Sequence, residues 1–274
     1  MIRNGSQRSV IPFCVLMVVL IFLYLPFVMV TMASFNASKY GGEWVGFSLK
    51  WYESLFENDA ILDALKTTLF IAAMSTFFAT ILGTMAALAL HWMKSRIRGI
   101  YSALVHTPLV VPDILHGVGL LLLFVTAKHL LSYCFGWEFE LGMVTIIIAH
   151  VTFCVSYVTM VVVGRLETFD GHLIEAAHDL GAGALYTFFK VTMPMILPGI
   201  IAGALFSFTL SIDDFVITFF VKGAGDTTLP IYIQSAMRRG NPAEINALSV
   251  IFLAFTFIFV FVTQMLLTRK KETK

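Results

Sequence analysis

The sequence has little charge. Asp, Glu, Lys and Arg make up 13% of its 274 residues, about half the share of an average soluble domain. The net charge of +1 gives no reason to expect nucleic acid as a partner. The three cysteines (Cys14, Cys134 and Cys154) form no CxxC pair and are interpreted as small hydrophobic residues within helices. A GxxxxGK[ST] phosphate loop is missing, so any ATP hydrolysis would belong to another subunit.

Long apolar runs are abundant instead. Hydrophobic residues make up 58% of the chain, and 26 residues are Phe. A bilayer core about 30 Å thick needs about 20 consecutive apolar residues per helix. We therefore predict an all-α integral membrane protein, one transmembrane domain over 1–274, without a cleaved signal. Its six expected spans are approximately 10–33, 67–90, 101–127, 141–164, 197–221 and 245–268.

Basic residues in the flanks predict the orientation. Eleven of the 18 Lys and Arg residues lie in the N-terminus, the loops 91–100 and 165–196, and the C-terminal tail. We therefore expect both termini in the cytoplasm. The long outer loop 34–66 contains Trp44, Trp51 and Tyr52, which suit a membrane interface, and a short surface helix is expected over 51–65.

Acidic residues inside two predicted spans point to a substrate pathway. Asp113, Asp213 and Asp214 share their spans with no Lys or Arg, so the local potential would favour a cation over an anion. The aromatic rings of Phe208, Phe215 and Phe219 could add cation–π attraction for an ammonium group. We predict a substrate pathway that includes the three aspartates with Phe208 and Phe215, and a diamine or polyamine as the solute. The alternative is that these carboxylates form structural pairs or lie at the outer interface.

Local sequence around these acids adds detail. Pro108, Pro112 and Gly117 flank Asp113 and predict a broken helix beside it. The neighbours Asp213 and Asp214 would point about 100° apart on a helix, so both need not face one pore. Three isolated histidines within the spans (His106, His116 and His150) have no metal-site spacing and are interpreted as helix packing. No metal site and no catalytic constellation is expected.

The segment EAAHDLGAGALYTFFKVTMPMILPG begins at Glu175. Its first residues favour a helix that Gly181 and Gly183 end in left-handed conformations. A second short helix over 184–190 would stop before Pro194 and Pro198. Such a helix–turn–helix unit suits a groove on another protein, whereas the alternative is an amphipathic loop lying on the bilayer.

This segment resembles the EAA loop of ABC importer permeases, in which EAA, three residues, Gly, nine residues and Ile-x-Leu-Pro follow one another. Val191 and Met193 replace the Ile and Leu. The resemblance implies a loop 165–196 that couples the permease to a separate ATPase. The residues it assigns to coupling are Glu175, Ala176, Ala177, Asp179, Gly181 and Pro194.

Further stretches are similar to the PotC-type permeases of spermidine/putrescine importers: WVGFSLKWYESLFEND, PLVVPDI, AHVTFC, RLETFDGHLIEAAHDLGA, SFTLSIDDF and NPAEINAL. The resemblance implies a type I (MetI-like) permease fold and a non-catalytic subunit of an inner-membrane polyamine importer. Implied partners are a PotB-like permease, two PotA-like ATPase copies that use ATP and Mg, and a periplasmic PotD-like binding protein. No cofactor is expected on this chain.

Other functions stay open on the sequence alone. The same fold could carry thiamine or iron, and the acidic residues disfavour only anions. A self-sufficient secondary transporter or channel would be expected to show an internal repeat, and none is evident.

Overall fold

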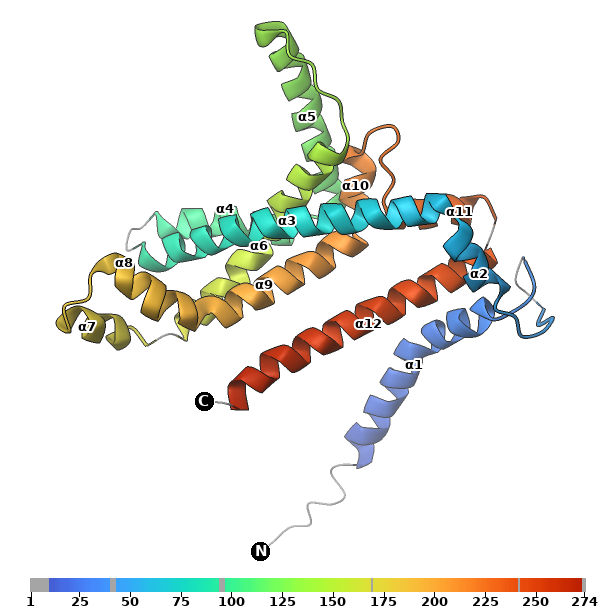
Figure 1. The fold of residues 1–274 in the computed structure, drawn as a ribbon, viewed down its shortest axis with the longest axis horizontal. Coiled ribbons are helices and arrows are strands. Elements are labelled where there is room, and N and C mark those ends of the chain that lie inside the picture. Colours follow the sequence, from blue (N-terminus) through green and yellow to red (C-terminus); the bar gives the residue numbers. More distant parts are fainter. Residues whose placement is uncertain (1–9, 40–42, 94–96, 169, 241, 273–274) are drawn as a thin grey trace, which may run out of the picture. The chain divides into compact units, whose positions relative to one another are not determined.

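The computed structural model describes residues 10–39, 43–93, 97–168, 170–240 and 242–272, which are almost entirely helical (Figure 1). Six of the helical segments described are long and apolar enough to cross a membrane. In chain order the helices are α1 (Val10–Ser34), α2 (Lys50–Glu57), α3 (Asp59–Trp92), α4 (Arg98–Val110), α5 (Asp113–Phe135), α6 (Met143–Glu167), α7 (His172–Asp179), α8 (Ala184–Thr187), η1 (Phe188–Thr192), α9 (Met193–Asp213), α10 (Val216–Val221), α11 (Leu229–Arg238) and α12 (Pro242–Glu272).

The predicted number of spans is confirmed, but two spans differ in their bounds. The third apolar helix covers Asp113–Phe135 and the fifth Ala184–Asp213, whereas 101–127 and 197–221 were expected. The third helix begins later and the fifth ends earlier than expected because the chain leaves the helical path between α4 and α5 and again between α9 and α10. At 1.5 Å per residue the fifth helix is about 45 Å long. It therefore extends beyond a hydrocarbon core of about 30 Å.

The chain divides into two compact units. The first takes its described residues from 10–59 and 233–259. Here the loop after α1 is organised by Asn36, whose side-chain oxygen accepts hydrogen bonds from the backbone N–H groups of Ser38 and Val45. Trp51 donates its indole N–H to the Asn36 carbonyl oxygen at 2.9 Å. The surface helix expected over 51–65 was predicted with the wrong end, because α2 stops at Glu57 and α3 begins at Asp59.

The second unit takes its described residues from 60–232 and 260–272 and is built around α6. This helix packs against α4, α9 and α10, and α10 packs against α5. Val158, which is fully buried, lies where small residues let helices approach closely. A Cβ at Gly83 of α3 or Gly203 of α9 would lie 2.7 or 3.3 Å from Val158 atoms. Close backbone approach at glycine is a common way for membrane helices to pack. The prediction of one domain over 1–274 stays a prediction.

Candidate functional site

Two interruptions of the helical path define the candidate site. Val111 and Pro112 are extended (ψ 130° and 137°) between α4 and α5, as the prolines predict. Asp214 is extended (ψ 122°) between α9 and α10, where no proline or glycine marks the break. Because irregular backbone at membrane depth is tolerated only where it is buried in protein or lines a cavity, these breaks locate a functional region.

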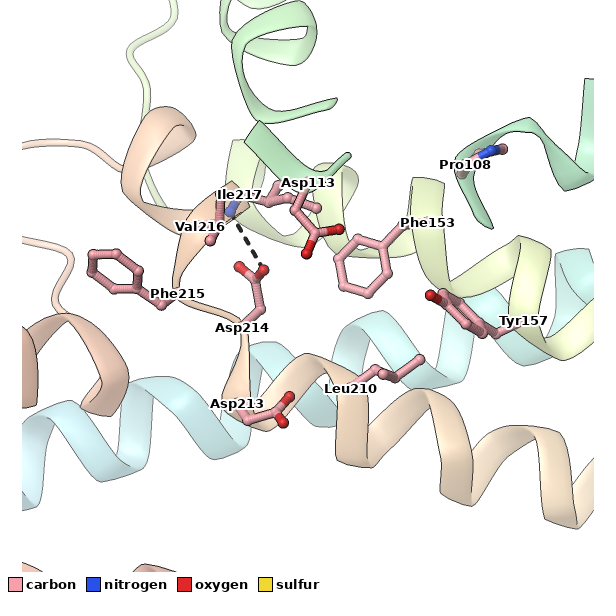
Figure 2. A pocket seen from close by; sticks show the side chains of 10 residues that line it. All are labelled: Pro108, Asp113, Phe153, Tyr157, Leu210, Asp213, Asp214, Phe215, Val216 and Ile217. Carbon is pink, nitrogen blue, oxygen red and sulfur yellow. Dashed lines mark hydrogen bonds between the residues drawn. The ribbon is translucent and has the colours of Figure 1, made fainter. Parts of the chain in front are cut away.

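A cavity of about 310 Å³ lies at these breaks. Figure 2 shows the side chains of Asp113, Asp213 and Asp214 around it, together with the aromatic rings of Phe153, Tyr157 and Phe215. None of the described residues that line it is Lys or Arg. The lining residues come from α4, α5, α6, α9, α10 and the second break: Pro108, Asp113, Phe153, Tyr157, Leu210, Asp213, Asp214, Phe215, Val216 and Ile217.

Asp214 caps α10. Its carboxylate accepts hydrogen bonds from the backbone N–H groups of Ile217 (3.4 Å) and Thr218 (2.8 Å) and from the Thr218 hydroxyl (2.7 Å). An acidic side chain at a helix N-terminus satisfies N–H groups that have no partner within the helix. The side chain is only 10% exposed and lies 3.3 Å from the His150 ring nitrogen Nε2. Asp214 therefore has a structural role in addition to its place in the cavity wall.

His150 on α6 joins this cap to α9. Its Nε2 lies 2.9 Å from the Thr218 hydroxyl, and its Nδ1 lies 2.7 Å from the Ser211 hydroxyl. The order Ser211, His150, Asp214 resembles a hydrolytic triad, but Ser211 is 2% exposed and does not line the cavity. A nucleophile must reach its substrate, so the arrangement is structural rather than catalytic.

Asp113 and Asp213 differ from Asp214 in exposure and in hydrogen bonding. Both are exposed. Among the described residues neither carboxyl forms an ion pair or bonds to another residue, and the Asp213 carboxyl bonds only to its own backbone. Asp113 is the first residue of α5 and Asp213 the last of α9. These two acids therefore enter the cavity with their oxygens available to a ligand (Figure 2).

Only one of the three predicted aromatic residues lies among the described residues that line the cavity. Phe215 lines the cavity. Phe208 and Phe219 do not line it; Phe208 is on α9 five residues before Asp213, which puts it on another face of the helix. Sequence reasoning missed Phe153 and Tyr157. Their spacing from His150 (three and seven residues) places all three on one face of α6, which is the signal that was available.

The predicted coupling segment forms a second candidate site. Glu175, Ala176, Ala177 and Asp179 lie in α7, and α7 ends as Gly181 takes a left-handed conformation at φ +81°. Glu175 and Asp179 are exposed, and the Glu175 carboxylate lies 3.3 Å from His172 Nδ1. Apolar side chains surround the turn on the surface, with Leu180 89%, Leu185 77% and Phe189 61% exposed.

Two details of that segment were predicted wrongly. Gly183 is extended (φ −71°, ψ 159°) rather than left-handed, because the single turn at Gly181 already reverses the chain. Pro194 and Pro198 do not stop a helix. The helix runs from Ala184 to Asp213 through the π-helical turn η1, where the Met193 N–H donates to the Phe188 carbonyl five residues back. A wider turn relieves the clash between a proline ring and the preceding carbonyl, so the helix continues.

Comparisons with known proteins agree with this architecture. Residues 79–270 match the family model for the binding-protein-dependent transport system inner membrane component. The chain is 44% identical to the putrescine transport system permease protein PotI of Escherichia coli over 92% of this chain and 89% of that protein. It is 37% identical to the spermidine/putrescine transport system permease protein PotC of Haemophilus influenzae, over 93% and 95% of the two chains.

Solved structures share the fold. A bacterial ABC transporter that imports the acidic polysaccharide alginate matches 96% of both chains with a TM-score of 0.76 at 18% identity. The MetNI methionine ABC transporter in an inward-facing conformation matches 76% of this chain and 95% of its own with a TM-score of 0.60 at 18% identity. The expectation of a MetI-like permease fold is thereby confirmed. This chain belongs to the family of binding-protein-dependent transport system inner membrane components, the permease subunits of ABC importers.

Proposed function

We propose that this chain is a permease subunit that imports polyamines, with putrescine and spermidine as the substrates. The observation that carries the proposal is the cavity at the two helix breaks, into which Asp113 and Asp213 present carboxyls that bond to no other described residue. The curated relatives named above are putrescine and spermidine/putrescine permeases, and they support the same substrate class.

The chemistry of the cavity fits an alkyl diamine. Each ammonium group needs hydrogen-bond acceptors and a compensating charge, which a carboxylate supplies. At an effective dielectric constant of about 20, opposite unit charges about 4 Å apart attract by about 4 kcal/mol. Phe153, Tyr157 and Phe215 add apolar surface for the methylene chain and ring faces for the cationic ends.

An anionic substrate fits poorly. One structural relative imports an acidic polysaccharide, but at 18% identity the likeness shows only that the two chains share a fold. In this chain the cavity wall contains three acidic residues and no described Lys or Arg. These acidic residues would repel an anionic substrate.

The proposed partners follow from the family. A second, PotB-like permease completes the pathway, a PotD-like protein delivers polyamine from the periplasm, and two PotA-like ATPase copies bind ATP and Mg. We assign ATPase docking to α7, Gly181 and the apolar surface of Leu180, Leu185 and Phe189, which are exposed in this chain. This multi-pass inner-membrane protein would then have both termini in the cytoplasm, with alternating access moving polyamine through the cavity.

The test is ATP-dependent uptake of labelled putrescine and spermidine by the reconstituted four-component transporter. Asp113→Asn and Asp213→Asn should each raise the KM about tenfold or more, because a bond to a charged group is lost. Asp63→Asn is the matched control, since Asp63 is exposed and pairs only with Lys66 on the same helix. Unchanged putrescine uptake in the double variant Asp113→Asn/Asp213→Asn would refute the assignment. Excess unlabelled thiamine or ferric iron should leave putrescine uptake unchanged, and inhibition by either would favour that competing substrate.

A further inference from the structure

The imidazole of His150 contacts both sides of the second helix break. It is 1% exposed and lies on α6, outside the interrupted span. Nδ1 meets Ser211 in the last turn of α9, and Nε2 meets Thr218 in the first turn of α10. One side chain therefore connects two helix ends that the extended Asp214 separates.

Hydrogen bonding determines which ring nitrogen donates. The Thr218 hydroxyl gives its hydrogen to Asp214 at 2.7 Å, so its oxygen can only accept from His150. The neighbouring atom within 3.3 Å of Nε2 is a carboxylate oxygen, which also accepts. An unprotonated Nε2 would face two acceptors, so Nε2 must carry a hydrogen. Ser211 then completes the ring's bonding at Nδ1.

The position of Asp213 depends on this arrangement. Among the described residues its carboxyl bonds only to its own backbone, so the backbone sets its position. His150 fixes that backbone on both sides, through Ser211 two residues before and Asp214 one residue after. A shift of about 1 Å in a positioning contact is enough to lower efficiency strongly in a preorganised site.

We propose that His150 is a positioning residue, whose Nε2–H holds the break between α9 and α10 in the geometry that presents Asp213 to the cavity. It does not itself touch substrate, since it lies behind the cavity wall and is not a lining residue. The transport readout rests on the proposed polyamine function, whereas the spectroscopic readout below is independent of any substrate.

Replacing His150 by an amide side chain tests the hydrogen bonds of the two ring nitrogens separately. The Gln side-chain amide extends as far from Cβ as Nε2, and the Asn amide only as far as Nδ1. His150→Gln can therefore still donate to Thr218 and Asp214, whereas His150→Asn can reach only Ser211. His150→Phe keeps the ring volume and removes both bonds. His129→Phe is the control, because His129 is exposed near the far end of α5.

We expect uptake efficiency to fall about tenfold or more in His150→Phe and His150→Asn, mainly through KM, and to stay within about threefold in His150→Gln and His129→Phe. Equal losses in the Gln and Asn variants would overturn the proposal. Nitrogen-15 NMR of histidine-labelled permease in lipid provides the second test. The signal that disappears in His150→Phe should belong to a ring protonated at Nε2, and a ring protonated only at Nδ1 would refute the assignment even if no polyamine is transported.

Discussion

Substitution of Asp214 should lower the stability of the fold, whereas substitution of its neighbour Asp213 should lower transport alone. Asp214→Ala removes the cap of α10 and leaves the Thr218 hydroxyl without an acceptor in a buried site, whereas the His150 Nε2–H keeps the Thr218 oxygen as its acceptor. Loss of a cap costs about 1 kcal/mol, and a stranded buried donor costs about 1 kcal/mol or more. The free energy of unfolding should therefore fall by about 2 kcal/mol.

Asp213→Ala strands no donor among the described residues and should change the free energy of unfolding by less than about 0.5 kcal/mol. Thermal unfolding of the detergent-solubilised permease is the assay. For a chain of this size, about 2–4 °C per kcal/mol predicts a drop of about 4–8 °C for Asp214→Ala and almost none for Asp213→Ala.

Uptake completes the comparison, because Asp213→Ala should transport poorly while melting normally. Equal melting temperatures for the two variants would refute the distinction between a capping and a ligand-facing acid. A stable but fully active Asp213→Ala variant would refute its place in the pathway. His129→Phe again serves as the reference for an exposed position.

Three further outcomes follow from the structure. Gly181→Ala should cost about 1–2 kcal/mol at the left-handed turn (φ +81°) and lower polyamine-stimulated ATPase activity of the complex, and normal activity would contradict the docking assignment. Gly223→Ala would put a Cβ 2.1 Å from the Leu141 carbonyl oxygen, so the melting temperature should fall; an unchanged value would mean that the loop adjusts freely. Phe215→Leu should raise the KM for putrescine about two- to fivefold, as expected for a lost cation–π contact, while Phe208→Leu should not; equal effects would contradict the boundary of the cavity.

Local sequence determined several features without help from the rest of the chain. Long apolar runs determined the six apolar helices among the described residues, since each must satisfy its backbone internally in a membrane. Pro112 determined the first break, because it precedes the first residue of α5 and cannot continue the preceding helix. Gly181 determined the turn after α7, because glycine adopts a positive φ without a Cβ clash. Each of these effects depends on a few consecutive residues.

Tertiary structure decided where those features meet. No proline or glycine ends α9 at Asp213. The break there is stabilised by His150 from another helix, 64 residues before Asp214 in the sequence. The cavity likewise needs α6 beside both breaks, so Tyr157 and Phe153 could not be chosen from the sequence over Phe208. Side-chain periodicity shows which residues share a face but not which neighbour covers it, and that choice belongs to packing between distant segments.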